Sequence, residues 1–151
     1  MNPDLTLPFP AEALIPHRPP MRLIERLLSF KNGIGIAESI SFHETSLFDT
    51  ESSFKLCIYT ELMAQAFAAV QGYHNLLRSI PVQRGFLVGI RNMTLLDEAH
   101  DPGRILILTT IQSAFGGFVI ADGEILCKEK PIASGSIKLW APDSAKPKTE
   151  P

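Results

Sequence analysis

The chain has 151 residues, of which 45% are hydrophobic and 20% are charged, and its formal net charge is -2. This size and balance are typical of one globular domain that folds without disulfides or metal. The small net charge gives no global field for nucleic acid, and no apolar run reaches the roughly eighteen residues of a membrane span. The first twenty residues lack the basic segment and following apolar run of a secretory signal. Cys57 and Cys127 form no CxxC pair, so we expect a cytoplasmic protein with reduced thiols.

The two ends of the chain differ in composition from the rest. Prolines are frequent in the first twenty residues, and residues 142–151 are polar and proline-rich. We expect a single domain over residues 1–141, with residues 1–14 as an extended lead-in and residues 142–151 as a flexible tail.

Two strands joined by a tight turn are predicted near the start. Residues 22–30 are rich in apolar side chains, and Asn32 and Gly33 tolerate the positive φ angles of a short hairpin turn. The next segment alternates with a period of two, which is typical of a half-buried strand. We expect its apolar face to be Ile34, Ile36, Ile40 and Phe42, with only Glu38 out of place.

One long helix is predicted from about Phe54 to Arg78. The segment has no proline, a single glycine at position 72, and apolar residues nearly all the way round. Such a helix is enclosed by other structure instead of lying on the surface. We therefore expect it at the centre of the domain.

Four more strands are predicted after the helix, with turn signals between strands at Gly116-Gly117 and at residues 129–131. Gly123 falls inside one of these strands, because the period of two continues through it. Two strands, a long helix and four strands predict an α+β domain in which an antiparallel sheet wraps around the helix. Pairing of an exposed edge strand with a second subunit would extend the sheet, so we expect a dimer.

Three segments resemble the FabA/FabZ-type beta-hydroxyacyl-ACP dehydratases, which have the hotdog fold. Their order and spacing match the family's layout over most of the chain. The segments are Ile15-Pro16-His17-Arg18 with the residues that follow it, Glu61-Leu62-Met63-Ala64-Gln65-Ala66, and Phe86-Leu87-Val88-Gly89-Ile90 followed by Pro102-Gly103. The resemblance implies a dimeric hotdog domain that acts on 3-hydroxyacyl thioesters, with Phe86 and Gly89 beside the substrate.

The loop before the helix departs from that family. In the family a histidine on this loop acts together with an acidic residue on the helix across the dimer interface. Glu61 matches the acidic position, but the loop contains no histidine, and the family's histidine aligns with Leu47 or with Glu51 depending on the register. The shortened loop is similar to a divergent dehydratase-like branch associated with aryl polyene gene clusters.

Dehydration of a 3-hydroxyacyl thioester needs a base for the α proton, an acid for the leaving hydroxyl, and a donor for the enolate oxygen. We expect Glu61 to be the acid, since burial in an apolar helix would favour its neutral form. Gln65 lies one turn further along on the same face, where it would hold Glu61 in place and bind substrate. Backbone N–H groups near the helix start, at about Cys57 or Ile58, would serve as the enolate donor.

The identity of the base stays open. His43 follows the second strand, and Asp49 and Glu51 lie on the loop. A carboxylate of ordinary basicity abstracts such a proton poorly, and a histidine at the end of a strand is commonly a surface residue. His17 matches the family's Pro-His-Arg segment, where it is not catalytic, so we interpret it as structural.

An acyl carrier protein or coenzyme A would carry the acyl chain, and the partner subunit would be a second copy or another hotdog protein. In the family that the chain resembles, arginines gather at the mouth of the tunnel that binds the acyl chain, where they receive an acidic carrier protein. The arginines of this chain either gather in the same way or are scattered over the surface. The arginines concerned are Arg18, Arg22, Arg26, Arg84 and Arg91. No cofactor is expected, and the histidines have no metal-ligand spacing.

Three functions are compatible with these residues. The first is a dehydratase of fatty acid or polyketide-type lipid biosynthesis that forms a 2-enoyl thioester with Glu61 as the acid. The second is a catalytically silent hotdog subunit that pairs with an active partner. The third is an acyl-thioester hydrolase in which Glu61 activates water, so free acid in place of enoyl thioester would identify it.

Overall fold

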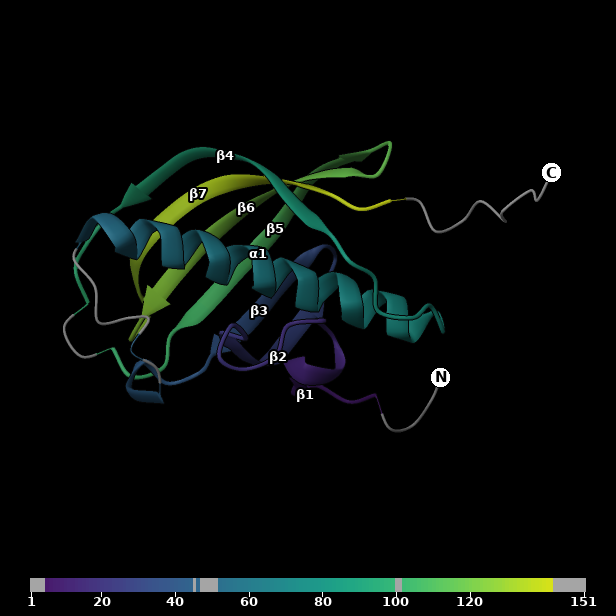
Figure 1. Cartoon of the computed structure of the whole chain (residues 1–151), viewed down its shortest axis with the longest axis horizontal. Coiled ribbons are helices and arrows are strands. Elements are labelled where there is room, and N and C mark those ends of the chain that lie inside the picture. Colours follow the sequence, from purple (N-terminus) through teal and green to yellow (C-terminus); the bar gives the residue numbers. More distant parts are fainter. Residues whose placement is uncertain (1–4, 45, 47–51, 100–101, 143–151) are drawn as a thin grey trace.

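The computed structural model describes residues 5–44, 46, 52–99 and 102–142. Within these ranges one long helix, α1 (Ser52–Leu77), lies against a curved seven-stranded sheet (Figure 1). The strands are β1 (Phe9–Pro10), β2 (Ile24–Lys31), β3 (Ile34–Ser39), β4 (Phe86–Leu95), β5 (Leu106–Phe115), β6 (Phe118–Cys127) and β7 (Lys130–Trp140). Two short 3-10 helices, η1 (Ala11–Ala13) and η2 (Phe42–Glu44), lie outside the sheet.

The sheet is antiparallel and its strand order is β1-β2-β3-β5-β6-β7-β4. The helix contacts every strand from β2 to β7, because the sheet curls around it. This is the hotdog arrangement that the sequence predicts. The strand β1, which the sequence did not indicate, extends the sheet beyond β2 through Phe9 and Pro10.

The predicted glycine turns are confirmed. Asn32 and Gly33 have φ angles of 52° and 76° between β2 and β3, and Gly116 and Gly117 have φ angles of 57° and 79° between β5 and β6. Gly123 lies within β6, as the alternation predicts. The turn after β6 is formed by residues 128 and 129, one position earlier than expected.

The prediction for the buried face of β3 is wrong. The buried residues of this strand are Gly35, Ala37 and Ser39, whereas Ile34 is exposed. The helix comes so close that a Cβ on Gly35 would lie 2.1 Å from Cγ2 of Val70. Only small side chains fit there, so the larger residues of β3 lie on the outer face of the sheet.

The N-terminal segment packs against the second half of the helix. Ala11, Leu14 and Ile15 are buried, and a Cβ on Gly72 would lie 2.0 Å from the carbonyl oxygen of Leu14. Glycine at position 72 therefore permits the backbone of this segment to touch the helix. The contact brings the following residues, Pro16 and His17, over the same helix.

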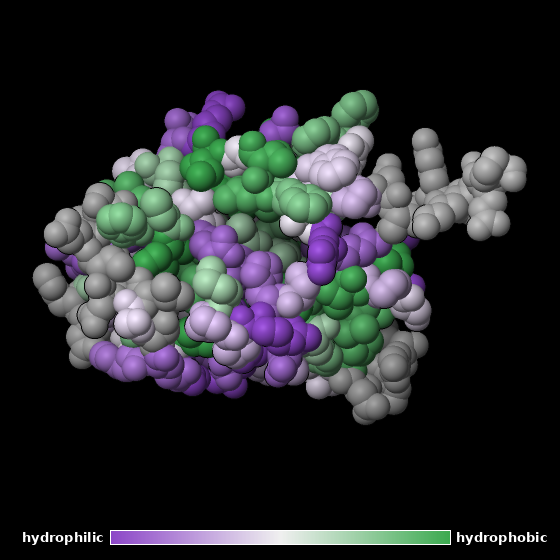
Figure 2. All heavy atoms as spheres, viewed as in Figure 1, coloured by the Kyte–Doolittle hydropathy of each residue, from purple (hydrophilic) through white to green (hydrophobic). Residues whose placement is uncertain are grey.

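The outer edge of β4 is apolar. β4 pairs with β7 on one side only, so its other side is an edge of the sheet. Figure 2 shows hydrophobic side chains gathered over β4 and the β5–β6 hairpin. The exposed large hydrophobic residues of β4, which we call the β4 edge patch, are Phe86, Leu87, Val88 and Ile90, and the exposed residues that follow them in the strand are polar.

Candidate functional site

A cavity of about 630 Å³ opens between α1, the N-terminal segment, the β5–β6 hairpin and the adjoining ends of β4 and β7. One face of α1 forms a wall of this cavity, because the lining residues recur every three or four positions. They are Glu61, Ala64, Gln65, Phe67, Ala68, Gln71, Gly72 and Asn75. The small residues leave space next to the helix, while the carboxylate and the amides supply polar groups.

The opposite wall is largely aromatic. The ring of Trp140 lies 5.9 Å from that of Phe86 and 6.4 Å from that of Phe118, centroid to centroid. The ammonium of Lys138 lies 4.6 Å from the centre of the Phe118 ring. Phe115, at the tip of the hairpin, is 88% exposed. A cavity of this size with apolar walls and a few polar groups is suited to a small organic ligand.

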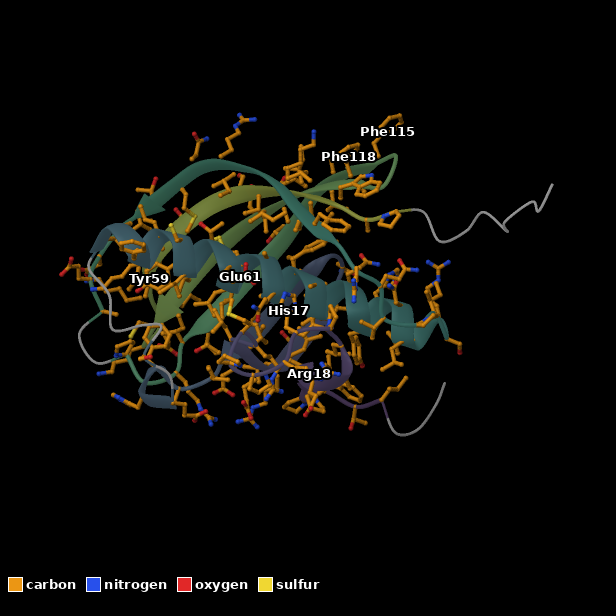
Figure 3. The ribbon with its side chains drawn as sticks, in the orientation of Figure 1. His17, Arg18, Tyr59, Glu61, Phe115 and Phe118 are labelled. Atoms are coloured by element: carbon orange, nitrogen blue, oxygen red, sulfur yellow. The ribbon has the colours of Figure 1, made fainter. Side chains whose placement is uncertain are left out.

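The polar end of the cavity contains a histidine and a carboxylate. Nε2 of His17 lies 3.7 Å from Oε1 of Glu61, and both side chains are about one-third exposed, at 34% and 35%. Figure 3 shows the two side chains together at the middle of α1, with Arg18 directed away from the helix. Both residues line the cavity. The chain therefore brings an imidazole to Glu61, although the loop before the helix has none.

Gln65 connects Glu61 to the segment that contains His17. Its Nε2 donates to Oε1 of Glu61 at 2.7 Å and to the carbonyl oxygen of Met21 at 2.8 Å. Its Oε1 accepts a hydrogen bond from the N–H of Leu23 at 2.8 Å. The Gln65 side chain is completely buried, while the Glu61 carboxylate that it contacts is partly exposed. The expected contact between Gln65 and Glu61 is thus present in the structure.

The segment around His17 is braced by its own hydrogen bonds. Nη1 of Arg18 donates to the carbonyl oxygens of Ile15 and His17, and the N–H groups of Met21 and Arg22 donate to the carbonyl oxygen of Arg18. Nδ1 of His17 is buried and has no hydrogen-bond partner within the part of the chain that the structure describes. The other ring nitrogen, Nε2, lies on the side of Glu61 and the cavity.

The residues expected to act as base lie elsewhere or are not described. His43 is in η2, where its side chain is exposed, and it does not line the cavity. Asp49 and Glu51 fall outside the described residues, as does Leu47. Interpreting His17 as a purely structural residue was incomplete, because chain folding places it beside Glu61. Its position follows from contacts between residues far apart in sequence, and no local pattern contains them.

The two residues expected as enolate donors, Cys57 and Ile58, do not lie at the helix start. α1 begins at Ser52, so the unpaired N–H groups belong to its first four residues. Cys57 and Ile58 come later, where backbone N–H groups bond within the helix, and neither residue lines the cavity. Cys57 is exposed, and Ile58 packs against the hydrophobic core. The helix starts one half-turn earlier than expected, which moves these two positions into its interior.

The other expected binding residues are divided between the cavity and the surface. Phe86 and Arg84 line the cavity, whereas Gly89 packs against Lys138 in β7. Nε of Arg18 lies 3.9 Å from Oε1 of Glu12, and Nη1 of Arg22 lies 4.0 Å from Oε2 of the same residue. The two remaining arginines are outside the cavity lining, with Arg26 bonded to Glu38 and Arg91 opposite Ser136.

The residues that the structure describes contain neither a metal-binding cluster nor a helix suited to span a membrane. None of their histidines, cysteines, aspartates and glutamates form a group of three or more that could hold a metal ion. None of their helices has the length and apolarity that crossing a membrane would require.

Solved structures with a similar fold include the dehydratase heterocomplex ApeI:P from Xenorhabdus doucetiae, which is 21% identical to this chain. The match has a TM-score of 0.77 and covers 90% of this chain and 93% of the other. The smu.793 protein of Streptococcus mutans, solved with acetyl CoA, is 12% identical, with a TM-score of 0.55 and coverages of 76% and 86%. The PaaI protein of E. coli is also 12% identical, with a TM-score of 0.53 and coverages of 76% and 80%. At these identities the likeness shows a common fold.

Sequence comparison identifies the family. No curated protein matches the chain significantly. The profile of the ApeP-like family, described as ApeP dehydratase, matches residues 9–150, which includes every strand and the helix. The chain therefore belongs to the ApeP-like dehydratase family and is a dehydratase-like hotdog protein.

Proposed function

We propose that the protein dehydrates 3-hydroxyacyl thioesters to 2-enoyl thioesters, with His17 as the base and Glu61 as the acid. The observation that supports this most directly is the distance of 3.7 Å between Nε2 of His17 and Oε1 of Glu61 in the wall of a cavity. An imidazole is better suited than a carboxylate to remove an α proton near neutral pH. Membership of a dehydratase family supports the same reaction class.

The proposed reaction uses each group once. Nε2 of His17 takes a proton from C2 of the substrate, and the electron pair of that C–H bond becomes the C2–C3 double bond. The C3–O bond breaks, and the hydroxyl leaves as water with the proton of the Glu61 carboxyl group. Water then takes the proton from the His17 imidazolium and returns one to the Glu61 carboxylate, which restores the starting state; both side chains are about one-third exposed, so water reaches them.

The acyl group would be carried by an acyl carrier protein or by coenzyme A. The cavity of about 630 Å³ extends along α1 from Glu61 to Asn75, which lie 14 residues apart on the helix. A helix rises about 1.5 Å per residue, so this wall is roughly 20 Å long. An acyl chain of medium length fits that dimension, and Arg84 in the lining is available for an anionic carrier group.

The test uses purified protein, 3-hydroxyacyl-ACP and mass spectrometry of the products. Wild type is expected to form the enoyl thioester, and His17→Gln and Glu61→Gln are each expected to lower kcat by about 10²- to 10⁴-fold. His43→Gln is the matched control, because it removes a histidine that does not line the cavity. Full activity of His17→Gln would contradict the assignment of the base. Free acid in place of enoyl thioester would establish the hydrolase.

A second candidate function is that of a silent subunit that completes the site of another hotdog protein. The observation that favours it is the β4 edge patch, which leaves apolar side chains exposed beside an unpaired strand edge. A solved structure with a similar fold is a dehydratase heterocomplex. Turnover by the purified protein alone would exclude this function, whereas activity that requires a second hotdog subunit and survives His17→Gln would support it.

A further inference from the structure

We infer that Gln65 is a positioning residue that holds His17 and Glu61 in their relative orientation, and this inference rests on the proposed function. The sequence alone suggests that Gln65 binds substrate or holds Glu61. The structure adds a second set of bonds, to the backbone of the segment that follows His17. Gln65 thereby acts on both members of the pair.

The hydrogen bonds of Gln65 define which way its amide points. Both N–H bonds are used, one to Oε1 of Glu61 and one to the carbonyl oxygen of Met21, and the amide oxygen accepts from the N–H of Leu23. Rotating the amide by half a turn would place its NH2 group against the Leu23 N–H and its oxygen against two acceptors. One orientation satisfies all three partners, so the completely buried amide presents its N–H to Oε1 of Glu61 from a defined position.

A continuous series of hydrogen bonds leads from Gln65 to His17. Gln65 bonds to Met21 and Leu23, and the N–H of Met21 donates to the carbonyl oxygen of Arg18. Nη1 of Arg18 in turn donates to the carbonyl oxygen of His17 at 2.8 Å. The backbone that carries the imidazole is therefore tied to the same amide that orients the carboxylate.

This arrangement also assigns roles to the two oxygens of Glu61. Gln65 donates to Oε1, and a donor bonded to one carboxyl oxygen leaves the other to carry the acidic proton. Oε2 is thus the oxygen that would protonate the leaving hydroxyl. Without Gln65 the carboxyl group would rotate, and the proton would no longer be directed at one place in the cavity.

A purely structural role for Gln65 makes a different prediction, because a buried amide can serve only to satisfy the backbone of Met21 and Leu23. The variant Gln65→Met keeps the length and volume of the side chain and removes all three bonds. Thr60→Val is the matched control, since Thr60 is also a buried polar residue of α1, bonds to the carbonyl oxygen of Leu56, and does not line the cavity. Both variants lose buried hydrogen bonds, but only one loses contact with Glu61.

The first measurement is steady-state dehydration by wild type, Gln65→Met and Thr60→Val, with urea denaturation to confirm that each variant is folded. Gln65→Met is expected to lower kcat by about 10- to 100-fold with less than about a 2-fold change in KM, because misplacement of reacting groups acts on the transition state. Thr60→Val is expected to keep kcat within about 2-fold. A value of kcat for Gln65→Met within that same range would overturn the positioning role.

The second measurement is a double-mutant cycle with Glu61→Gln. If Gln65 acts through Glu61, Gln65→Met has almost no further effect on kcat once Glu61 is replaced. If the double variant instead shows a loss of kcat equal to the product of the two single losses, the two residues act independently and the inference is overturned. Hydrogen exchange at the Leu23 amide, expected to be faster in Gln65→Met, reports the anchoring without turnover. An inactive wild type would overturn the proposed function and the positioning role together, whereas an active wild type with an insensitive Gln65→Met would overturn the positioning role alone.

Discussion

His17 and Glu61 face each other across 3.7 Å in the cavity wall, although one lies before the first long strand and the other in the middle of the helix. The contact depends on the close approach of the N-terminal segment to α1 at Gly72. A side chain at position 72 would separate the two backbones. The geometry of the candidate site thus depends on the packing of Leu14 against Gly72, further along the same helix.

Gly35→Ala is expected to destabilise the fold. The added Cβ would lie 2.1 Å from Cγ2 of Val70, so β3 or the helix has to move. Overpacking of this kind costs about 1–3 kcal/mol of unfolding free energy, which urea denaturation would measure. Gly85→Ala is the control, because its Cβ meets nothing nearer than the Trp140 carbonyl oxygen at 3.6 Å. Equal stability of the two variants would contradict the close packing of β3 on α1.

Ile90→Lys is expected to weaken association while leaving the fold intact. Ile90 is 56% exposed in the β4 edge patch, so a charge there is tolerated in the single subunit but not against an apolar partner. Ile34→Lys is the matched control, because Ile34 is similarly exposed on β3, away from the β4 edge. Light scattering after size exclusion would give the mass of each variant. Loss of association in Ile34→Lys instead would place the interface on the other part of the sheet.

Phe118→Ala is expected to raise KM for long acyl chains by about 3- to 10-fold with little change in kcat. Phe118 belongs to the aromatic wall of the cavity, and its ring contributes apolar area that binds substrate and transition state equally. Phe54→Ala, which removes an exposed ring outside the cavity lining, serves as control. Unchanged KM over a series of chain lengths would show that the acyl chain does not lie against this wall.

Stability is expected to fall above about pH 10, in part because of Tyr59. Burial raises the pKa of the Tyr59 hydroxyl above its ordinary value of 10.0, and the charges of Cys127 and Glu98 act in the same direction. Above pH 10 the unfolded chain loses this proton while the folded chain retains it, so each pH unit favours unfolding by up to about 1.4 kcal/mol until the folded pKa is reached. The difference in unfolding free energy between pH 8 and pH 11, measured by urea titration, should be smaller for Tyr59→Phe than for wild type. An identical difference would exclude Tyr59 as a cause.

Local sequence signals were sufficient for the helix and the turns. The segment around Leu62 and Ala66 is apolar nearly all the way round, as suits a helix packed into a curved sheet. The pairs at positions 32–33 and 116–117 adopt the positive φ angles that their residue types favour. Each of these features depends on residues adjacent in sequence. The same reasoning placed Gly123 inside a strand, which the structure confirms.

The buried face of β3 could not be predicted from hydrophobicity. Ile34 and Ile36 suggested the buried side, but the approach of Val70 leaves room only for small residues. The exception in the pattern, Glu38, was the informative residue, since on the outer face it bonds to Arg26 at 2.6 Å. A charged residue in register with the apolar side chains indicated that this face is in contact with solvent.

The site was predicted in part. Glu61 and Gln65 are one turn apart on a helix, so their contact follows from helix geometry. The proximity of His17 depends on how the N-terminal segment crosses the helix, which no periodicity describes. The absence of histidine from the loop before the helix therefore gave no information about whether the folded chain supplies one from another segment.

The pair formed by His17 and Glu61 belongs to one polypeptide, and association with another subunit does not create it. An assembly of this chain with a different hotdog protein would contain as many such pairs as it contains copies of this chain. Titrating one subunit against the other would then vary the number of pairs in proportion to the amount of this chain, whatever residues the other subunit contributes.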